Sequence, residues 1–114
     1  VETRTVDASV LPPRCSCGGV LRPDAVFFGE MIPPMALWRS RETTAACEVM
    51  LVIGTSAIVQ PAASMPMIAK ENGAVVIEIN PEATPLTGVV SDILIPGKAG
   101  EVLNRILARL EGRF

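Results

Sequence analysis

Apolar residues cluster into short unbroken runs in the middle of the chain. Residues 49–53 and 74–79 show almost no polar alternation, and each run ends in small or polar residues. A continuous apolar run of this length is typical of a strand buried on both faces, as in a parallel sheet. Shorter runs at residues 25–28 and 92–95, each closed by glycine or proline, predict two further strands.

Helical patterns lie between and after these runs. Pro34 can open a helix to about residue 46, with Met35, Trp38 and Ala45 expected to face inward. A second helix is predicted over residues 62–72, before the Asn72-Gly73 stop signal. The last helix, residues 99–110, has one apolar stripe made of Val102, Leu103, Ile106, Leu107 and Leu110.

The alternation of strands and helices predicts the α/β class. Such a chain forms a mostly parallel sheet with right-handed crossovers and helices on both faces. We therefore expect half of a Rossmann-like, doubly wound nucleotide-binding fold. The chain has no G-x-G-x-x-G turn, which such folds usually carry.

Polar residues follow the two strongest strands. Gly54, Thr55 and Ser56 end the first run, and Asn80 and Glu82 come directly after the second. Ligands of open α/β sheets bind at the carboxyl ends of the strands, so this pattern predicts a site for nucleotide ribose or phosphate. An ordinary Asn-Pro turn is the alternative interpretation of the second segment. Gly29-Glu30 ends the run at residues 25–28 in a similar way, and there the alternative is a glycine turn with a solvated glutamate.

Composition narrows the classes of partner. The 114 residues are 49% hydrophobic with a mean hydropathy of +0.42, so we expect one domain whose apolar surface meets a partner chain or a missing domain. No stretch reaches the roughly 20 apolar residues of a membrane helix. The net charge of −2 without a basic block gives no electrostatic basis for nucleic-acid binding.

Histidine and tyrosine do not occur in the sequence. Nucleophiles of the Ser-His and Cys-His types and a histidine general base are therefore excluded. If the chain belongs to an enzyme, carboxylates carry the proton chemistry or part of the active site lies elsewhere. We assign no catalytic residue in this chain.

Two of the three cysteines form a Cys-x-Cys pair followed by two glycines. Cys15 and Cys17 could belong to a metal knuckle, but zinc takes four ligands and only Cys47 remains. Two incidental cysteines in a turn are the alternative. Three cysteines make no disulfide framework, so we expect a reducing, cytoplasmic location.

Five motifs in order, over about residues 12–110, resemble the C-terminal half of sirtuins, the NAD-dependent protein lysine deacylases of the Sir2 family. They are Cys15-Ser16-Cys17-Gly18-Gly19-Val20-Leu21-Arg22-Pro23, Val26-Phe27-Phe28-Gly29-Glu30, Gly54-Thr55-Ser56 with Pro61-Ala62-Ala63, Ile79-Asn80-Pro81-Glu82, and Gly97-Lys98-Ala99-Gly100-Glu101-Val102-Leu103.

The resemblance implies two sets of binding residues. For NAD, it implies that Gly54, Thr55 and Ser56 form the turn at the ribose and phosphate. Asn80, Pro81 and Glu82 would form the segment at the adenine ribose, and Ala99 would lie beside the adenine. For an acyl-lysine peptide lying as an added strand between two loops, it implies Val26, Phe28, Gly29, Glu30 and, on the other side, Val59.

The resemblance also implies a structural zinc site and a division of the chain. Cys15 and Cys17 match the second cysteine pair of that site. Residues 1–24 would be the remnant of a small zinc-ribbon-like segment with its linker, and residues 25–114 the C-terminal part of the NAD-binding domain. The family's glycine-rich NAD turn, Asn-Ile-Asp motif, histidine base and first cysteine pair have no counterpart in this sequence.

Two functions follow as hypotheses. In the first, the parent protein is an enzyme that transfers acyl groups from lysine to the ADP-ribose of NAD and releases nicotinamide, while this chain alone is inactive. In the second, the chain is a non-catalytic nucleotide-binding or oligomerising half-fold. Its partners would be the missing N-terminal half or a second copy of the chain.

Overall fold

The computed structural model describes residues 6–7 and 9–112. The chain divides into two compact units, one ending at Ile32 and one beginning at Pro33. The boundary predicted between residues 24 and 25 lies inside the first unit. Each unit is described by itself below.

The first unit is built from turns. Backbone bonds from Cys15 N–H to Gly19 O and from Gly18 N–H to Cys15 O, both 2.9 Å, close the turn that carries the cysteine pair. The strand predicted at residues 25–28 is wrong, because the segment leads without pairing into a turn closed by Glu30 N–H to Phe27 O at 3.0 Å. An extended segment needs a neighbouring strand to become part of a sheet.

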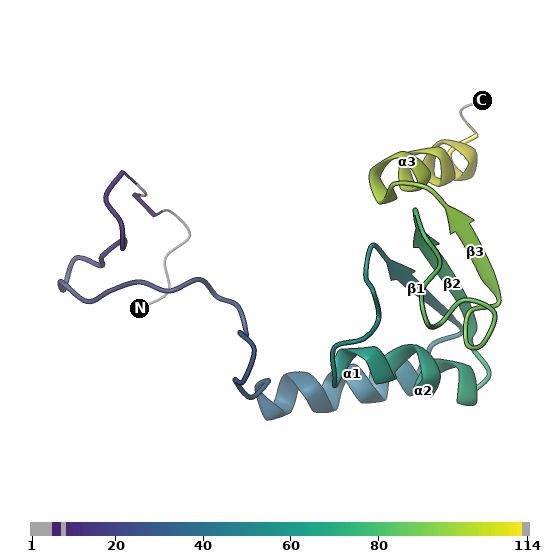
Figure 1. Cartoon of the computed structure of the whole chain (residues 1–114), viewed down its shortest axis with the longest axis horizontal. Coiled ribbons are helices and arrows are strands. Elements are labelled where there is room, and N and C mark those ends of the chain that lie inside the picture. The colour runs from purple at the N-terminus through teal and green to yellow at the C-terminus, as the bar shows by residue number, and fades with distance from the viewer. Residues whose placement is uncertain (1–5, 8, 113–114) are drawn as a thin grey trace. The chain divides into compact units, whose positions relative to one another are not determined.

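The second unit contains every helix and strand of the part of the chain that the structure describes (Figure 1). The predicted helices and the three later strands are confirmed. The elements are α1 (Pro34–Ala46), β1 (Val49–Ile53), the 3-10 helix η1 (Ala62–Ser64), α2 (Met65–Glu71), β2 (Val75–Asn80), β3 (Ile93–Pro96) and α3 (Ala99–Leu110).

The three strands form one parallel sheet in the order β1-β2-β3. Leu51 of β1 lies opposite Ile77 of β2, which in turn lies opposite Ile93 of β3. All three strands therefore end at the same edge. This parallel sheet with its helices confirms the predicted α/β class.

One face of the sheet carries the core of this unit. Residues of β1 and β2 pack there with α2 and with the loop at residues 81–92, which follows β2. The buried cluster consists of Val52, Ala69, Ala74, Val76, Leu86 and Val90. Because side chains alternate along a strand, Glu78 points to this same covered face as Val76.

The opposite face is aliphatic at every position of β1, β2 and β3 that points to it. The register places Val49, Leu51, Ile53, Val75, Ile77, Ile79, Ile93 and Ile95 on this aliphatic face. Ile79 is fully buried, and α3 contacts β2. Four others keep between 43% and 53% of their surface exposed, namely Val49, Leu51, Val75 and Ile93.

Helix α1 packs against α2, but not through the predicted residues. Thr44 is its buried residue, and its hydroxyl lies 3.7 Å from the sulfur of Met65. Met35 and Trp38 are 59% and 51% exposed, so the inward face predicted for this helix is wrong. Its main packing partner is α2, and the loose apolar pattern of the helix does not identify the residues that face it.

No helix among residues 6–7 and 9–112 combines the length and apolar character needed to cross a membrane.

The chain turns from β3 into α3 at Gly97, which has a φ of +147°. A Cβ atom at this position would lie 2.9 Å from Cγ2 of the buried Val102. We expect Gly97→Ala to lower the free energy of unfolding by about 1–3 kcal/mol, because strain and a clash coincide. Urea denaturation followed by circular dichroism measures this.

Gly100→Ala is the matched control. Gly100 lies inside α3, and a Cβ there meets no atom within 4 Å. Alanine should raise the free energy of unfolding by about 0.5–1 kcal/mol. Equal effects of the two substitutions would contradict the packing described for the start of α3.

Candidate functional site

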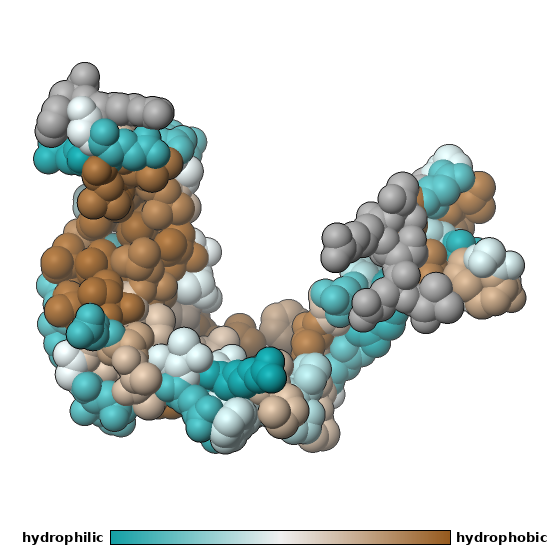
Figure 2. Space-filling view, turned by 180° about the vertical axis from the view of Figure 1, so that it is seen from behind, coloured by the Kyte–Doolittle hydropathy of each residue, from teal (hydrophilic) through white to brown (hydrophobic). Residues whose placement is uncertain are grey.

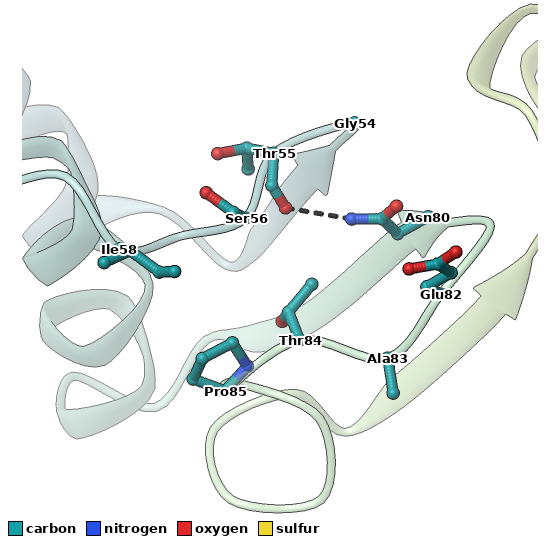
Figure 3. A pocket seen from close by; sticks show the side chains of 9 residues that line it. All are labelled: Gly54, Thr55, Ser56, Ile58, Asn80, Glu82, Ala83, Thr84 and Pro85. Carbon is teal, nitrogen blue, oxygen red and sulfur yellow. Dashed lines mark hydrogen bonds between the residues drawn. The ribbon is translucent and has the colours of Figure 1, made fainter.

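A cavity of about 350 Å³ opens at the carboxyl ends of β1 and β2 (Figure 3). Its wall comes from the turn after β1 and the loop after β2. The lining residues are Gly54, Thr55, Ser56, Ile58, Asn80, Glu82, Ala83, Thr84 and Pro85. The cavity thus brings together five of the seven residues that the sequence predicts for NAD. Pro81 lies between two lining residues, and Ala99 begins α3; neither belongs to the lining.

Two hydrogen bonds join the ends of β1 and β2 beside the cavity. The N–H of Gly54 donates to the carbonyl of Ile79 at 3.0 Å, and Nδ2 of Asn80 donates to the carbonyl of Thr55 at 2.9 Å. Gly54 has a φ of +60°, which lets the chain leave the strand in a sharp turn. The Gly-Thr-Ser turn is therefore fixed to the second strand end.

The lining chemistry suits a ligand with hydroxyl groups. Figure 3 shows the polar groups of Ser56, Asn80 and Glu82 around the space between the turn and the loop. An amide can donate to and accept from ribose hydroxyls and a carboxylate can accept from them, whereas the negative charge of Glu82 disfavours a phosphate beside it. The cavity holds the features of a binding site for a nucleoside.

The sequence did not identify Ile58 or the segment from Ala83 to Pro85 as part of the wall. It also missed Glu78, which lies under that segment and is fully buried. Glu78 accepts hydrogen bonds from the hydroxyls of Thr84, Thr87 and Ser91, the last two at 2.7 and 3.1 Å. A carboxylate inside an apolar strand, followed by three hydroxyl residues in one loop, is the signal that could have revealed it.

Burial of the Glu78 carboxylate acts to raise its pKa, but the bonds from the three hydroxyls outweigh this effect and lower it below the ordinary value. Glu78 is therefore held as an anion inside the covered face of the sheet.

Val59 lies in a second, mostly apolar cavity of about 210 Å³. This cavity is lined by residues of β1, of the following turn and of the start of α2. They are Met50, Val52, Thr55, Ala57, Val59, Ala62, Ala63, Met65 and Pro66. Thr55 lines both cavities, so the Gly-Thr-Ser turn separates a polar space from an apolar one.

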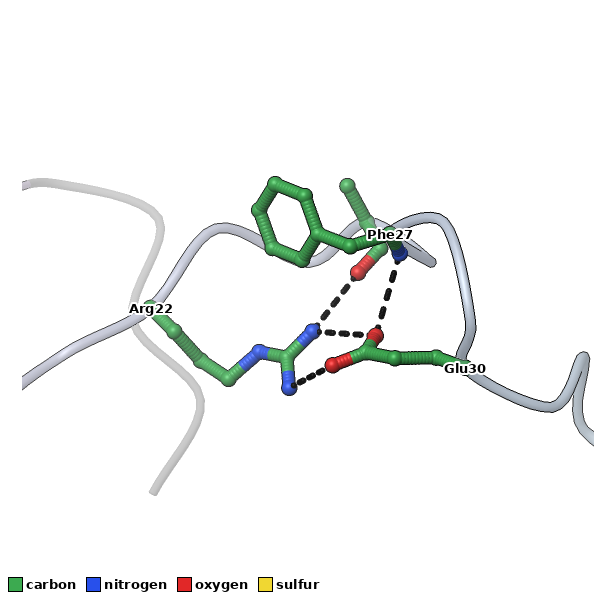
Figure 4. Close-up of polar contacts among 4 residues, drawn as sticks. Arg22, Phe27 and Glu30 are labelled. Carbon is green, nitrogen blue, oxygen red and sulfur yellow. Dashed lines mark hydrogen bonds and ion pairs between the residues drawn. The ribbon is translucent and has the colours of Figure 1, made fainter.

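In the first unit, Arg22 and Glu30 form a two-pronged ion pair (Figure 4). The two guanidinium-to-carboxylate distances are 2.9 and 2.8 Å, and the N–H of Phe27 donates to the same carboxylate at 3.0 Å. Arg22 also donates to the carbonyl of Ala25 and lies 5.2 Å from the centre of the Phe27 ring. These contacts close the loop at residues 22–30.

Four of the predicted peptide-binding residues lie on this loop: Val26, Phe28, Gly29 and Glu30. Phe28 is 91% exposed. Val59, assigned to the other side of the same peptide, lies in the second unit. The hydrogen bonds from Arg22 and Phe27 lower the pKa of Glu30 from 4.5 to about 2.

Cys15 and Cys17 are joined by a disulfide in this structure, and the N–H of Cys17 lies 3.1 Å from the sulfur of Cys15. Cys47 is free and half-buried. Among residues 6–7 and 9–112, no group of three or more histidine, cysteine or carboxylate side chains could hold a metal ion.

A parallel sheet with a cavity at its strand ends is the arrangement found in nucleotide-binding α/β proteins. Within this class, the sequence profile of the Sir2 family matches residues 2–61. The chain belongs to the Sir2 family.

Known proteins of this family match most of the chain. NAD-dependent protein deacylase 1 of Archaeoglobus fulgidus is 50% identical over 96 residues, which are 83% of this chain and 39% of that protein. The crystal structure of a Sir2 homologue in complex with NAD superposes with a TM-score of 0.77 at 48% identity, covering 88% of this chain and 39% of the other.

A Sir2 structure bound to a propionylated peptide superposes with a TM-score of 0.76 at 29% identity, covering 93% of this chain and 44% of the other. The chain thus spans about two fifths of the length of the curated relatives it matches.

The Arg22–Glu30 contact gives a pH-dependent prediction. Because the pKa of Glu30 is depressed, its contribution to loop order is complete above pH 4.5 and is lost as the pH falls toward about 2. Carboxyl NMR titration should therefore give Glu30 a midpoint near 2, and Arg22→Gln should raise this midpoint by about 1 pH unit or more.

Arg14→Gln, in the same unit but with its guanidinium bonded to the carbonyl of Gly18 at 2.8 Å, is the control and should leave the Glu30 midpoint unchanged. A Glu30 midpoint near 4.5 in the unmodified chain would show that the ion pair does not hold the loop in solution.

Proposed function

We propose that this chain supplies the adenosine-side NAD site and part of the acyl-lysine peptide clamp of an NAD-dependent protein lysine deacylase. In this reaction an acyl group moves from lysine to the ADP-ribose of NAD, and nicotinamide is released. The observation that carries the proposal is the cavity at the strand ends, where Thr55, Asn80 and Glu82 meet. Membership of the Sir2 family and relatives named as NAD-dependent deacylases support it.

For NAD, we assign the adenine ribose to Asn80, Pro81 and Glu82 and the neighbouring ribose and phosphate to the turn at Gly54, Thr55 and Ser56. A volume of about 350 Å³ is at the lower end for small-molecule sites, which suits a nucleoside-sized part of the dinucleotide. Ala99 is proposed to lie beside the adenine, since it begins the helix that follows β3. These roles are binding roles, and no step of the chemistry is assigned to them.

For the peptide, we propose that the extended segment and turn at residues 26–30 bind one side of the substrate backbone and Val59 the other. Support comes from the exposed Phe28 and from the Arg22–Glu30 pair, which fixes the turn without using the backbone groups of Gly29. A related Sir2 structure contains a propionylated peptide, and the corresponding substrate here would be an acyl-lysine protein or peptide.

For zinc, we propose that Cys15 and Cys17 supply two of four ligands once they are reduced. The knuckle fits this role because the N–H of Cys17 points to the sulfur of Cys15 and would stabilise a thiolate. The remaining ligands would come from outside this chain. A reducing compartment such as the cytoplasm would keep both thiols available, and we propose that location.

For partners, we propose that the exposed part of the aliphatic face packs against the remainder of a sirtuin fold. Figure 2 shows apolar residues gathered in a broad band over the second unit next to α3. Val49, Leu51, Val75 and Ile93 are about half exposed on this face, and Leu107 and Leu110 of α3 are 52% and 81% exposed. A contiguous exposed apolar surface of this kind is typical of a protein–protein contact.

The same surface favours a second candidate function, a nucleotide-binding half-fold that associates with a copy of itself. Neither candidate gives turnover by the chain alone, and the two differ in association: a self-associating half-fold predicts the mass of a dimer in size-exclusion chromatography of the chain alone. We expect the chain alone to release no nicotinamide from NAD and an acetylated peptide, because it has no histidine to act as base. Chromatographic detection of nicotinamide measures this, and clear release would contradict the division of the active site proposed here.

Binding of ADP-ribose tests the NAD site directly. ADP-ribose is the part of NAD that remains after nicotinamide leaves, so it should bind the full chain in isothermal titration calorimetry. Asn80→Ala removes both a ribose partner and the bond to Thr55, and should raise the dissociation constant about tenfold.

Asn72→Ala is the matched control, since Asn72 also donates its amide to a backbone carbonyl, that of Ile68, but lies at the end of α2 outside the cavity lining. It should leave ADP-ribose binding unchanged. If the unmodified chain, Asn80→Ala and Asn72→Ala bind ADP-ribose with equal affinity, the assignment of this cavity as the NAD site is refuted.

A further inference from the structure

Glu78 is a carboxylate within an apolar strand and is completely buried on the covered face of the sheet. Its neighbours in β2 on either side are isoleucines, and Val76 shares its face. Burying an ionised group is costly unless hydrogen bonds replace the lost water. The residue therefore depends on specific partners, and these partners all come from one loop.

Three hydroxyls of the loop at residues 81–92 donate to the carboxylate. Thr84 bonds one oxygen, while Thr87 and Ser91 bond the other at 2.7 and 3.1 Å. The loop is also connected to the sheet through Leu86 and Val90 in the core and, at its end, through Asp92, whose carboxylate accepts from the N–H of Val76 at 2.9 Å. Glu78 is thus the polar attachment point for Thr84, Thr87 and Ser91, while Asp92 attaches the end of the loop.

The direction of these bonds is determined by the carboxylate, which can only accept. Each threonine hydroxyl must donate to Glu78, so its oxygen remains available to accept from the backbone. The N–H of Thr84 donates to the Thr87 hydroxyl at 2.9 Å, and the N–H of Leu86 donates to the Thr84 hydroxyl at 3.2 Å. The anion therefore orients the loop backbone as well as its side chains.

The loop so attached forms one wall of the cavity. Thr84 lines the cavity together with Ala83, Pro85 and Glu82 (Figure 3). Asn80, which also lines the cavity, lies two residues after Glu78 in β2. Strand β2 therefore carries both Asn80 of the cavity lining and Glu78, which holds the loop that forms the wall.

We propose that Glu78 is a positioning residue for the nucleotide, holding the wall at residues 82–85 in place without touching the ligand. This inference rests on the proposed NAD site and adds to it a residue outside the cavity lining. The depressed pKa of Glu78, in spite of its burial, agrees with a carboxylate that stays ionised among its three donors.

The test compares Thr87→Val with Thr87→Ser in the full chain. Valine keeps the shape of the side chain but removes the bond to Glu78 and the acceptor for the N–H of Thr84, whereas serine keeps the hydroxyl and both bonds. ADP-ribose affinity from calorimetry should fall about tenfold in Thr87→Val and stay within about twofold of the unmodified chain in Thr87→Ser. Glu78→Gln should weaken affinity at least as much, because its amide group donates where the loop needs an acceptor.

A ligand-free readout accompanies the affinity. Amide hydrogen exchange at Leu86, whose N–H donates to the Thr84 hydroxyl and not to Thr87, should be about tenfold faster in Thr87→Val when measured by NMR, with strand amides of β2 unchanged. Val76→Ala is the control for a general loss of stability: it removes core contacts beside Glu78 and should lower the melting temperature without changing the ADP-ribose affinity.

The outcomes separate this inference from the proposed function. If the unmodified chain binds ADP-ribose and Thr87→Val binds it equally well, the positioning role of Glu78 is overturned and the NAD site stands. If affinity falls equally in Thr87→Val and Val76→Ala, Glu78 has only a structural role. If the unmodified chain binds no ADP-ribose, the NAD site and its positioning residue are both refuted.

Discussion

The parallel pairing of β1 with β2 is the interaction on which the rest of the second unit depends. Parallel strands share a direction, so the residues that follow each strand meet at one edge of the sheet. Here two hydrogen bonds fix the strand ends relative to each other, one from Gly54 to Ile79 and one from Asn80 to Thr55. The cavity, the turn beside it and the separation from the second, apolar cavity all follow from that pairing.

The same pairing has a cost on each face of the sheet. On one side it places Glu78 within the core, where three hydroxyls of the following loop donate hydrogen bonds to the carboxylate. On the other side it aligns valine, leucine and isoleucine into a continuous aliphatic face, of which Ile79 is buried and several members are not. The buried anion and the exposed aliphatic face are thus two consequences of one strand register, and each points to a role beyond stability.

The first unit is organised by different forces. Its described residues form no sheet or helix, and the loop that carries Phe28 and Gly29 is closed by the Arg22–Glu30 pair and the N–H of Phe27. A bidentate guanidinium–carboxylate contact fixes both distance and orientation, which suits a loop without a core of its own. Local charge pairing here takes the place that strand pairing has in the second unit.

The sequence by itself determined the three parallel strands and the helices between them, because apolar runs, proline at Pro34 and glycine at Gly73 act locally. It also predicted that the residues after β1 and β2 would meet, since that follows from parallel direction alone. Only the tertiary structure decided that residues 25–28 stay unpaired, that Thr44 rather than Trp38 is buried in α1, and that Glu78 holds the loop after its strand. Each of these depends on which distant residues are present to pack or to donate, and local patterns do not contain that information.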